Sequence, residues 1–220
     1  MTRFYIVLAI ALLAGSPPAS AESTHGIAAT ELAKWPFWGV GAVSTWGPQF
    51  AMREADNSKG VMIISPNSYR GDVVLRYQFM ALTPATVGVA MLAVSDPGET
   101  DRLTLPDDYD GALGPWFNDK PNYFFAYKNA PHSVTPFVRQ NPDAAEPLAV
   151  AEENVMIAGV YYDIEVGRRD GKLWLSVDGE TLFEADDDAP LPGGHVALRL
   201  RGTAGFPAGC LIKDFSITTD

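Results

Sequence analysis

The chain has 220 residues, of which 47% are hydrophobic and 20% are charged, a length and composition that suit a folded domain with a sizeable core. Acidic residues outnumber basic ones by 27 to 16, so the net charge is −11 at pH 7. This charge argues against a nucleic-acid partner, because binding a phosphate backbone requires clustered Lys and Arg. The single cysteine, Cys210, excludes an intramolecular disulfide, and we expect it to be a small buried hydrophobe.

The first 21 residues predict a secretory signal peptide. Arg3 precedes an unbroken apolar run at positions 4–14, which is too short to span a bilayer of roughly 30 Å as a helix. Two prolines break the run, and Ala19-Ser20-Ala21 has the small residues that signal peptidase cleaves after. We therefore expect residues 22–220 to form a single domain that is periplasmic or secreted, with no membrane insertion once the signal peptide is removed.

After the signal peptide, helical periodicity is almost absent. Residues 27–34 predict two helical turns that end before Pro36. Elsewhere apolar residues recur with a period of two, or in short β-branched and aromatic runs between Gly, Pro, Asn and Asp, which indicates strands. The predicted strands are 50–54, 60–65, 72–81, 86–94, 122–128, 134–139, 161–169, 172–177, 181–184, 195–201 and 210–218. This pattern predicts an all-β sandwich or barrel.

Two of these strands alternate cleanly between their faces. Arg76 and Gln78 share one face of their strand, and the apolar residues share the other. Asp163 and Glu165 likewise share a face, which we expect to look to solvent or into a groove.

The turns and long loops also follow from the sequence. Asp170-Gly171 and Asp178-Gly179 predict two-residue hairpins, because both central positions of a type I′ turn have positive φ. The strands on either side should therefore form a three-stranded meander. Two long irregular stretches, 95–121 and 140–155, interrupt the strand pattern, and loops of such length are usually functional or mobile.

The C-terminal half carries three ordered elements. The stretch 161–180 ends in Val-Asp-Gly-Glu, 191–199 reads Leu-Pro-Gly-Gly-His-Val-Ala-Leu-Arg, and 212–217 closes with Ile-Lys-Asp-Phe-Ser-Ile. This order resembles the concanavalin A-like lectin/glucanase superfamily, and 122–127 with 135–139 look like central strands of uncharacterised bacterial members linked to polysaccharide utilisation. The resemblance covers roughly residues 50–218 and implies a two-sheet antiparallel β-sandwich, a jelly roll. Because that fold hosts lectins, hydrolases, lyases and inert modules, it does not select a function.

The acidic motif of the superfamily's retaining glucanases, Glu-x-Asp-x-x-Glu, is missing from this sequence. Asp163 and Glu165 have the right spacing, but no third carboxylate follows near Arg168. We therefore interpret Asp163 and Glu165 as a solvent-facing acidic pair.

Residues of the types that polysaccharide lyases of this fold use, namely Tyr, His, Arg, Gln and Asn, fall together in one part of the chain. The candidate catalytic residues are Tyr127, His132 and Arg139, and the candidate substrate-binding residues are Trp116, Tyr123, Asn129 and Gln140. Tyr123 and Tyr127 are four residues apart, so they share a face of one strand. The other interpretation is a half-buried aromatic face beside a surface histidine.

Sugar binding requires exposed aromatic rings and planar polar groups. The candidate rings are Trp116 and Phe117 in the first long loop, and Trp35, Phe37, Trp38 and Trp46 near the start of the mature chain. Such rings more often pack in the core or at the sandwich edge, and we favour Trp116 because it lies in an acidic loop between Pro115 and Asn118. Asp108 with Asp110, and residues 186–188, offer oxygens of the kind that suits calcium, but neither has the spacing of a known loop. No metal site is assigned and no cofactor is expected.

The sequence thus predicts an exported carbohydrate-recognising jelly roll that binds or acts on a polysaccharide or oligosaccharide. Two alternatives stay open. One is a polysaccharide lyase or glycoside hydrolase with a cleft around Tyr127, His132 and Arg139, and the other is a structural or partner-binding sandwich with no sugar ligand. The sequence does not predict the oligomeric state.

Overall fold

The computed structural model describes residues 22–131, 134–142 and 144–220. These residues form β1 (Ser23–Ile27), α1 (Ala29–Leu32), β2 (Phe37–Gly39), β3 (Gly41–Trp46), β4 (Gln49–Glu54), β5 (Val61–Arg70), β6 (Val73–Ala81), β7 (Val87–Val94), α2 (Gly114–Asn118), β8 (Asn122–Lys128), β9 (Phe137–Asn141), β10 (Ala149–Val150), β11 (Tyr161–Arg169), β12 (Lys172–Val177), β13 (Glu180–Asp186), β14 (Gly193–Arg201) and β15 (Gly209–Thr219).

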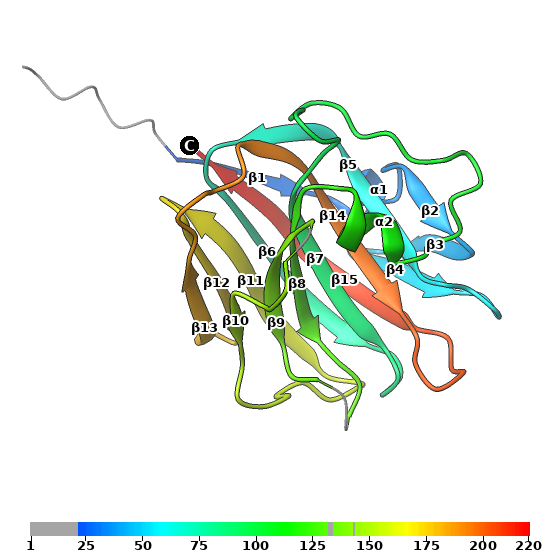
Figure 1. Ribbon diagram of the computed structural model, residues 1–220. Helices are drawn as coiled ribbons and strands as arrows, with labels where there is room; N and C mark the ends of the chain where they lie inside the picture. The colour runs from blue at the N-terminus through cyan, green and yellow to red at the C-terminus, as the bar shows by residue number, and fades with distance from the viewer. Residues whose placement is uncertain (1–21, 132–133, 143) are drawn as a thin grey trace, which may run out of the picture.

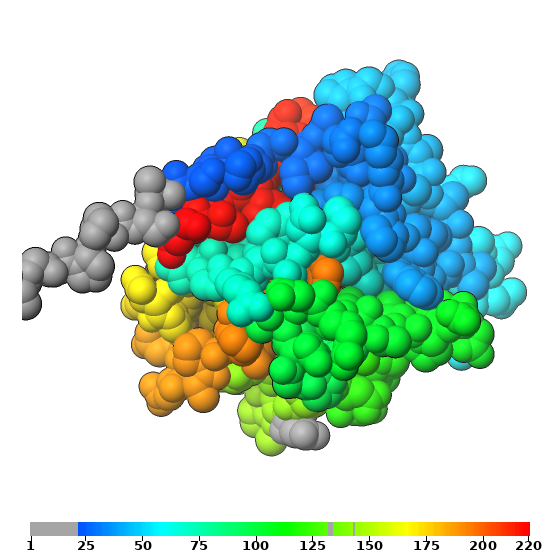
Figure 2. Space-filling model, turned by 90° about the horizontal axis from the view of Figure 1, so that it is seen from above, coloured from blue at the N-terminus to red at the C-terminus, as the bar shows by residue number. Residues whose placement is uncertain are grey.

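The strands form two antiparallel sheets that pack face to face, which confirms the predicted all-β jelly-roll sandwich (Figure 1). Sheet I has the strand order β13-β12-β11-β6-β15-β4-β3, and β1 also pairs with β15. Sheet II has the order β10-β9-β8-β7-β14-β5-β2. Figure 2 shows the blue N-terminal strand lying against the red C-terminal strand, as the pairing of Ser23 with Thr219 requires.

Each predicted strand is present, with ends that shift by a few residues. β1, β2, β3 and β10 were not predicted. β2 and β10 are only three and two residues long, and five of the six residues of β3 are exposed, so none of them has an alternating apolar face to detect. The helix predicted at 27–34 is shorter than expected, because only Ala29–Leu32 is helical.

The main core lies between the two sheets. On β6, the residues predicted to share the apolar face, from Val73 to Phe79, are at most 3% exposed. Phe50, Phe79 and Phe125 are completely buried, and burying each such ring stabilises the fold by about 2 kcal/mol. Cys210 is also completely buried, as expected, and burial raises the pKa of its thiol to about 12.

Both predicted Asp-Gly hairpins are confirmed. Asp170 and Gly171 have φ of 49° and 76°, and Asp178 and Gly179 have φ of 52° and 79°. Positive φ at both positions is the signature of the type I′ turn. β11, β12 and β13 therefore form the expected meander at one edge of sheet I.

The long loop 95–121, with α2, covers the outer face of sheet II, where Figure 1 shows it in front of β7, β8 and β14. Its apolar residues Leu105, Tyr109 and Trp116 pack on Met91 and Phe124 of the sheet and form a second core. The buried Arg199 of β14 donates hydrogen bonds of 2.9 Å to the carbonyl oxygens of Lys59 and Gly111, which pins the loop in place. The outer face of sheet II is therefore closed, whereas that of sheet I carries no such cover among the described residues.

Within the ranges that the structure describes, no helix has the length and apolar character needed to cross a membrane.

Candidate functional site

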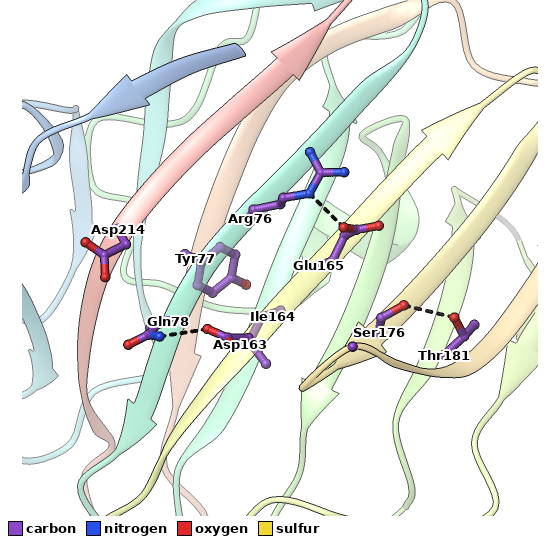
Figure 3. Close-up of a pocket in the computed structure, with 10 residues that line it drawn as sticks. Arg76, Tyr77, Gln78, Asp163, Ile164, Glu165, Ser176, Thr181 and Asp214 are labelled. Atoms are coloured by element: carbon purple, nitrogen blue, oxygen red, sulfur yellow. Dashed lines mark hydrogen bonds and ion pairs between the residues drawn. The ribbon is translucent and has the colours of Figure 1, made fainter.

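A pocket of about 530 Å³ opens on the outer face of sheet I, the face turned away from sheet II. This volume lies within the range of small-molecule sites. β6 and β11 supply its floor, Ser176 and Thr181 form one wall, and Asp214 of β15 stands on the opposite side (Figure 3). Asp214 has φ of 54° and lies in a β-bulge, an irregularity that is common beside functional sites.

Two polar pairs cross the floor from β6 to β11 (Figure 3). Arg76 Nε donates to Glu165 Oε2 at 2.7 Å, and Gln78 Nε2 donates to Asp163 Oδ1 at 2.8 Å. The pairs form because Arg76 lies directly opposite Glu165, and Gln78 opposite Asp163, in the strand register. Each carboxylate has about four lone-pair sites and each partner has further N–H groups, so the pairs can bind hydroxyl groups of a ligand as well as each other.

The indole of Trp174 extends the floor beyond Glu165. Its Nε1 donates to Glu165 Oε1 at 2.6 Å. A Cβ built on Gly167 would lie 2.1–2.4 Å from three atoms of the indole, so the ring lies face-on over the Gly167 backbone. Only glycine permits this approach in the middle of a strand. The other face of the ring is therefore turned away from the sheet, beside two planar polar pairs.

Replacing Gly167 by Ala is expected to displace the Trp174 indole, because the new methyl group would overlap the ring. We expect a lower free energy of unfolding, by about 1–3 kcal/mol, and a changed near-UV circular dichroism signal from tryptophan. Gly26→Ala is the matched control, since nothing lies within 4 Å of a Cβ there. Equal stability and equal spectra for the two variants would contradict the proposed position of the ring.

Comparison with known proteins gives the fold a name. No protein-family model and no curated protein sequence matches the chain. Among solved structures, it is similar to a Bacillus subtilis protein of unknown function with a galectin-like fold, with a TM-score of 0.72 and 14% identity over 86% of this chain and 90% of that one. The chain has the concanavalin A-like fold. The predicted resemblance is thus confirmed.

Two further solved structures share this concanavalin A-like fold. One is carbohydrate binding module CBM66 from Bacillus subtilis, with a TM-score of 0.56 and 15% identity over 84% of this chain and 94% of that one. The other is a prokaryotic β-1,3-1,4-glucanase (lichenase) derived from a mouse hindgut metagenome, with a TM-score of 0.60 and 11% identity over 89% and 98%. At these identities the similarity shows the fold, so function has to be argued from the site.

The candidate catalytic residues do not meet in one cleft within the described part of this concanavalin A-like chain. Tyr123 and Tyr127 share a face of β8 as predicted, but it is the inner face, and each is 1% exposed. The Tyr127 ring packs on Phe79, with centroids 5.0 Å apart, and burial raises its pKa well above the usual value. Arg139 lies opposite Phe124 on the outer side of sheet II, so the sheet separates it from Tyr127. His132 lies outside the described residues.

Two of the candidate substrate-binding residues, Tyr123 and Gln140, form hydrogen bonds that hold the segment 187–191 in place. Tyr123 donates to Asp187 at 2.5 Å and accepts from the Leu191 N–H at 2.8 Å. Gln140 donates to the Ala189 carbonyl at 3.0 Å, so Tyr123 and Gln140 secure the same segment.

Asn129 and Trp116 are also held inside the protein. Asn129 is buried and donates to the Thr135 carbonyl at 3.1 Å. Trp116 is completely buried rather than exposed, and its Nε1 donates to the Tyr109 hydroxyl at 2.6 Å. Its ring therefore offers no face to a sugar in this structure.

Three of the five acidic residues considered for calcium have protein partners. Asp110 pairs with Lys59 at 2.7 Å, Asp187 accepts from Tyr123, and Asp186 lies 3.8 Å from Lys172. In the parts of the chain that the structure describes, no three His, Cys, Asp or Glu residues are grouped to hold a metal ion.

Sequence reasoning placed Asp163 and Glu165 on an open face but missed Trp174 as their neighbour. A signal for it existed. In a two-residue hairpin centred on Asp170-Gly171, simple counting pairs Gly167 with Trp174, and the structure has this pairing. A glycine inside a strand opposite a tryptophan indicates a ring that lies across the backbone.

Proposed function

We propose that the protein binds carbohydrate on the outer face of sheet I. The Arg76–Glu165 and Gln78–Asp163 pairs bind sugar hydroxyls, and Trp174 packs against the C–H face of a sugar ring. The observation that carries this proposal is the Trp174 indole laid over Gly167, next to two planar polar pairs that line an open pocket. An apolar ring with a few fixed polar groups is the usual composition of a small-molecule site.

Two other observations support a carbohydrate ligand. Solved structures with this fold include a carbohydrate binding module and a lichenase. The other outer face, on sheet II, is filled by the loop 95–121, so the open surface of the sandwich is on sheet I. Export to the periplasm or the cell exterior is part of the proposal, and rests on the apolar run that precedes residue 22.

We favour binding over catalysis because the carboxylates are engaged as acceptors. Glu165 accepts from Arg76 on one oxygen and from Trp174 on the other. A glycosidase requires a protonated carboxyl group that can donate to the leaving oxygen. Both oxygens of Glu165 are therefore occupied as acceptors within the protein, which leaves neither oxygen placed to donate to a leaving group.

A glycan array followed by calorimetry tests the proposal. We expect binding to neutral glycans, and we expect Trp174→Ala to weaken it at least about tenfold while the chain stays folded, as far-UV circular dichroism would show. Phe206→Ala is the control, since this ring is 66% exposed on a loop outside the site. Absence of binding across the array, or equal affinity for Trp174→Ala and wild type, would overturn the proposal.

Incubation with neutral and uronate-containing polysaccharides separates binding from catalysis. New reducing ends would indicate a hydrolase, and absorbance from an unsaturated product would indicate a lyase. We expect neither, and either product would show that the site does more than bind.

A further inference from the structure

Trp46, at the end of edge strand β3, is 80% exposed, more than any other large hydrophobic side chain of the described residues. It does not line the pocket beside Trp174. A single exposed apolar residue needs no explanation by itself. Its place in the strand register, however, relates it to the proposed sugar site.

Trp46 lies on the same outer face of sheet I as that site. It pairs with Gln49 of β4, and the preceding pair, Thr45 with Phe50, places Phe50 in the core. Because successive side chains of a strand point to opposite faces, Trp46 and Gln49 point away from the core.

The register continues from Gln49 to the proposed site in one row. Phe50 pairs with Ile212, so Gln49 is level with Lys213 on β15. Lys213 pairs with Gln78, and Gln78 pairs with Asp163. The row from Trp46 to Asp163 thus crosses the sheet at right angles to its strands.

A second hollow lies beside this row. This pocket, of about 400 Å³, lies at the turn of the β3–β4 hairpin, where Gly47 and Pro48 line it together with Phe215 and residues 26–30. Asp214 lines both this pocket and the one on the site's floor, so the two hollows adjoin at the bulge of β15. The hollowed surface therefore continues from the Arg76–Glu165 pair, past the bulge of β15, to the turn that follows Trp46.

We propose that the sugar site extends across sheet I from Trp174 to Trp46 and binds an internal stretch of a linear, neutral polysaccharide. This inference rests on the proposed function. From β12 to β3 the sheet has five strand spacings, or about 24 Å, and Trp174 lies about 13 Å along the strands from the row, because it pairs with Gly167, four residues beyond Asp163. A diagonal path between the two indoles is therefore about 27 Å long and accommodates about five sugar units of roughly 5 Å each. The two indoles then act as platforms for the two ends of the bound stretch.

The charges along this surface select a neutral chain. Two cations beside the row are engaged by neighbouring side chains, Arg76 by Glu165 at 2.7 Å and Lys213 by the Tyr161 ring, 4.6 Å from the centroid. The carboxylates of Asp163, Glu165 and Asp214 would repel the carboxylates of a uronate polymer. The net charge of −11 adds to this repulsion.

Calorimetry with a series of β-1,3-1,4-glucan oligosaccharides tests the inference. The series runs from the disaccharide to the hexasaccharide. If the glycan array shows binding to a different neutral glycan, oligosaccharides of that glycan are used instead. We expect affinity to rise by about tenfold or more up to the pentasaccharide and then to level off. Trp46→Ala should abolish most of that rise and leave the disaccharide affinity and the thermal stability unchanged. Trp174→Ala should weaken binding of every length, and Phe206→Ala should change none.

The outcomes separate this inference from the proposed function. Equal affinity for all lengths would overturn the extended site, and so would a pentasaccharide affinity that Trp46→Ala leaves unchanged. In either case, binding of the disaccharide would still support the proposed carbohydrate-binding function. Tighter binding of polygalacturonate than of neutral chains would overturn the neutral selectivity. No binding to any glycan would overturn both proposals.

Discussion

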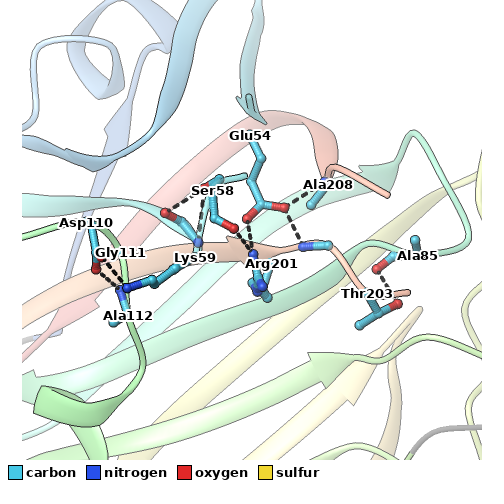
Figure 4. Close-up of polar contacts among 12 residues, drawn as sticks. Glu54, Ser58, Lys59, Ala85, Asp110, Gly111, Ala112, Arg201, Thr203 and Ala208 are labelled. Carbon is cyan, nitrogen blue, oxygen red and sulfur yellow. Dashed lines mark hydrogen bonds and ion pairs between the residues drawn. The ribbon is translucent and has the colours of Figure 1, made fainter. Parts of the chain in front are cut away.

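Glu54→Ala is expected to unfold with a free energy about 3 kcal/mol below that of wild type. The Glu54 side chain is 1% exposed, and Figure 4 shows it at the centre of a polar cluster at the base of the β14–β15 loop. Its Oε2 accepts from the N–H groups of Gly202 and Ala208, at 2.5 and 2.8 Å, and its Oε1 lies 3.2 Å from Arg201 Nη1. Truncation would leave two buried N–H groups without an acceptor and remove the carboxylate partner of Arg201.

Urea unfolding of three variants tests this expectation. Glu54→Gln keeps an acceptor oxygen and should lose less stability than Glu54→Ala. Glu31→Ala is the surface control, since Glu31 pairs with Lys34 through side chains that are 57% and 68% exposed, and such pairs contribute little. If Glu54→Ala were as stable as Glu31→Ala, the cluster would not be holding the loop.

Asp96→Asn is expected to lower the free energy of unfolding by about 2 kcal/mol at neutral pH. Asp96 stands at the start of the loop 95–121, and Lys120 at its end donates to it at 2.6 Å. Thr104 donates through both its N–H, at 3.0 Å, and its hydroxyl, at 2.9 Å. These contacts close the loop that covers sheet II, and the Asp96 side chain is only 10% exposed.

The loss of stability in Asp96→Asn should be largest at neutral pH and should decrease in acid. Burial alone would raise the pKa of Asp96, but the hydrogen bonds from Lys120 and Thr104 hold it well below the usual range. A depressed pKa stabilises the folded state above the unfolded-state pKa of about 3.9, and this stabilisation is lost as the pH falls below that value.

Unfolding curves at several pH values therefore provide the measurement. The stability gap between wild type and Asp96→Asn should be constant above about pH 5 and shrink below about pH 4. Asp107→Asn is the control, because Asp107 is an exposed carboxylate of the same loop. A gap that stays constant into acid would show that the ionised carboxylate is not what closes the loop.

The sequence was informative where structure depends on near neighbours. Alternation along β6 located the core face, and the Asp-Gly pairs located two hairpins, because both signals are complete within ten residues. It was less informative for β8, where all seven residues are buried. The period of two shows that Tyr123 and Tyr127 share a face of β8. It does not show whether that face packs against sheet I or lies under the loop 95–121, because both faces carry buried apolar residues.

The site depends on contacts between residues far apart in the chain. Arg76 and Glu165 are 89 positions apart, and Gln78 and Asp163 are 85 apart, so pattern alone did not join them. Trp116 was expected to be exposed because its loop is acidic. It is buried because the loop folds back on sheet II, a long-range packing that its local composition does not encode.

The position of β15 has a consequence for the order of folding. This strand follows every other described element in the chain, yet it lies inside sheet I, where it pairs with β6 on one side and with β4 and β1 on the other. Until it is in place, β13-β12-β11-β6 and β4-β3 are two separate pieces with no shared edge. Contacts between residues so distant in sequence form slowly. We expect a chain synthesised only as far as residue 208 to lack a complete sheet I, a delay that would suit the export proposed for this protein.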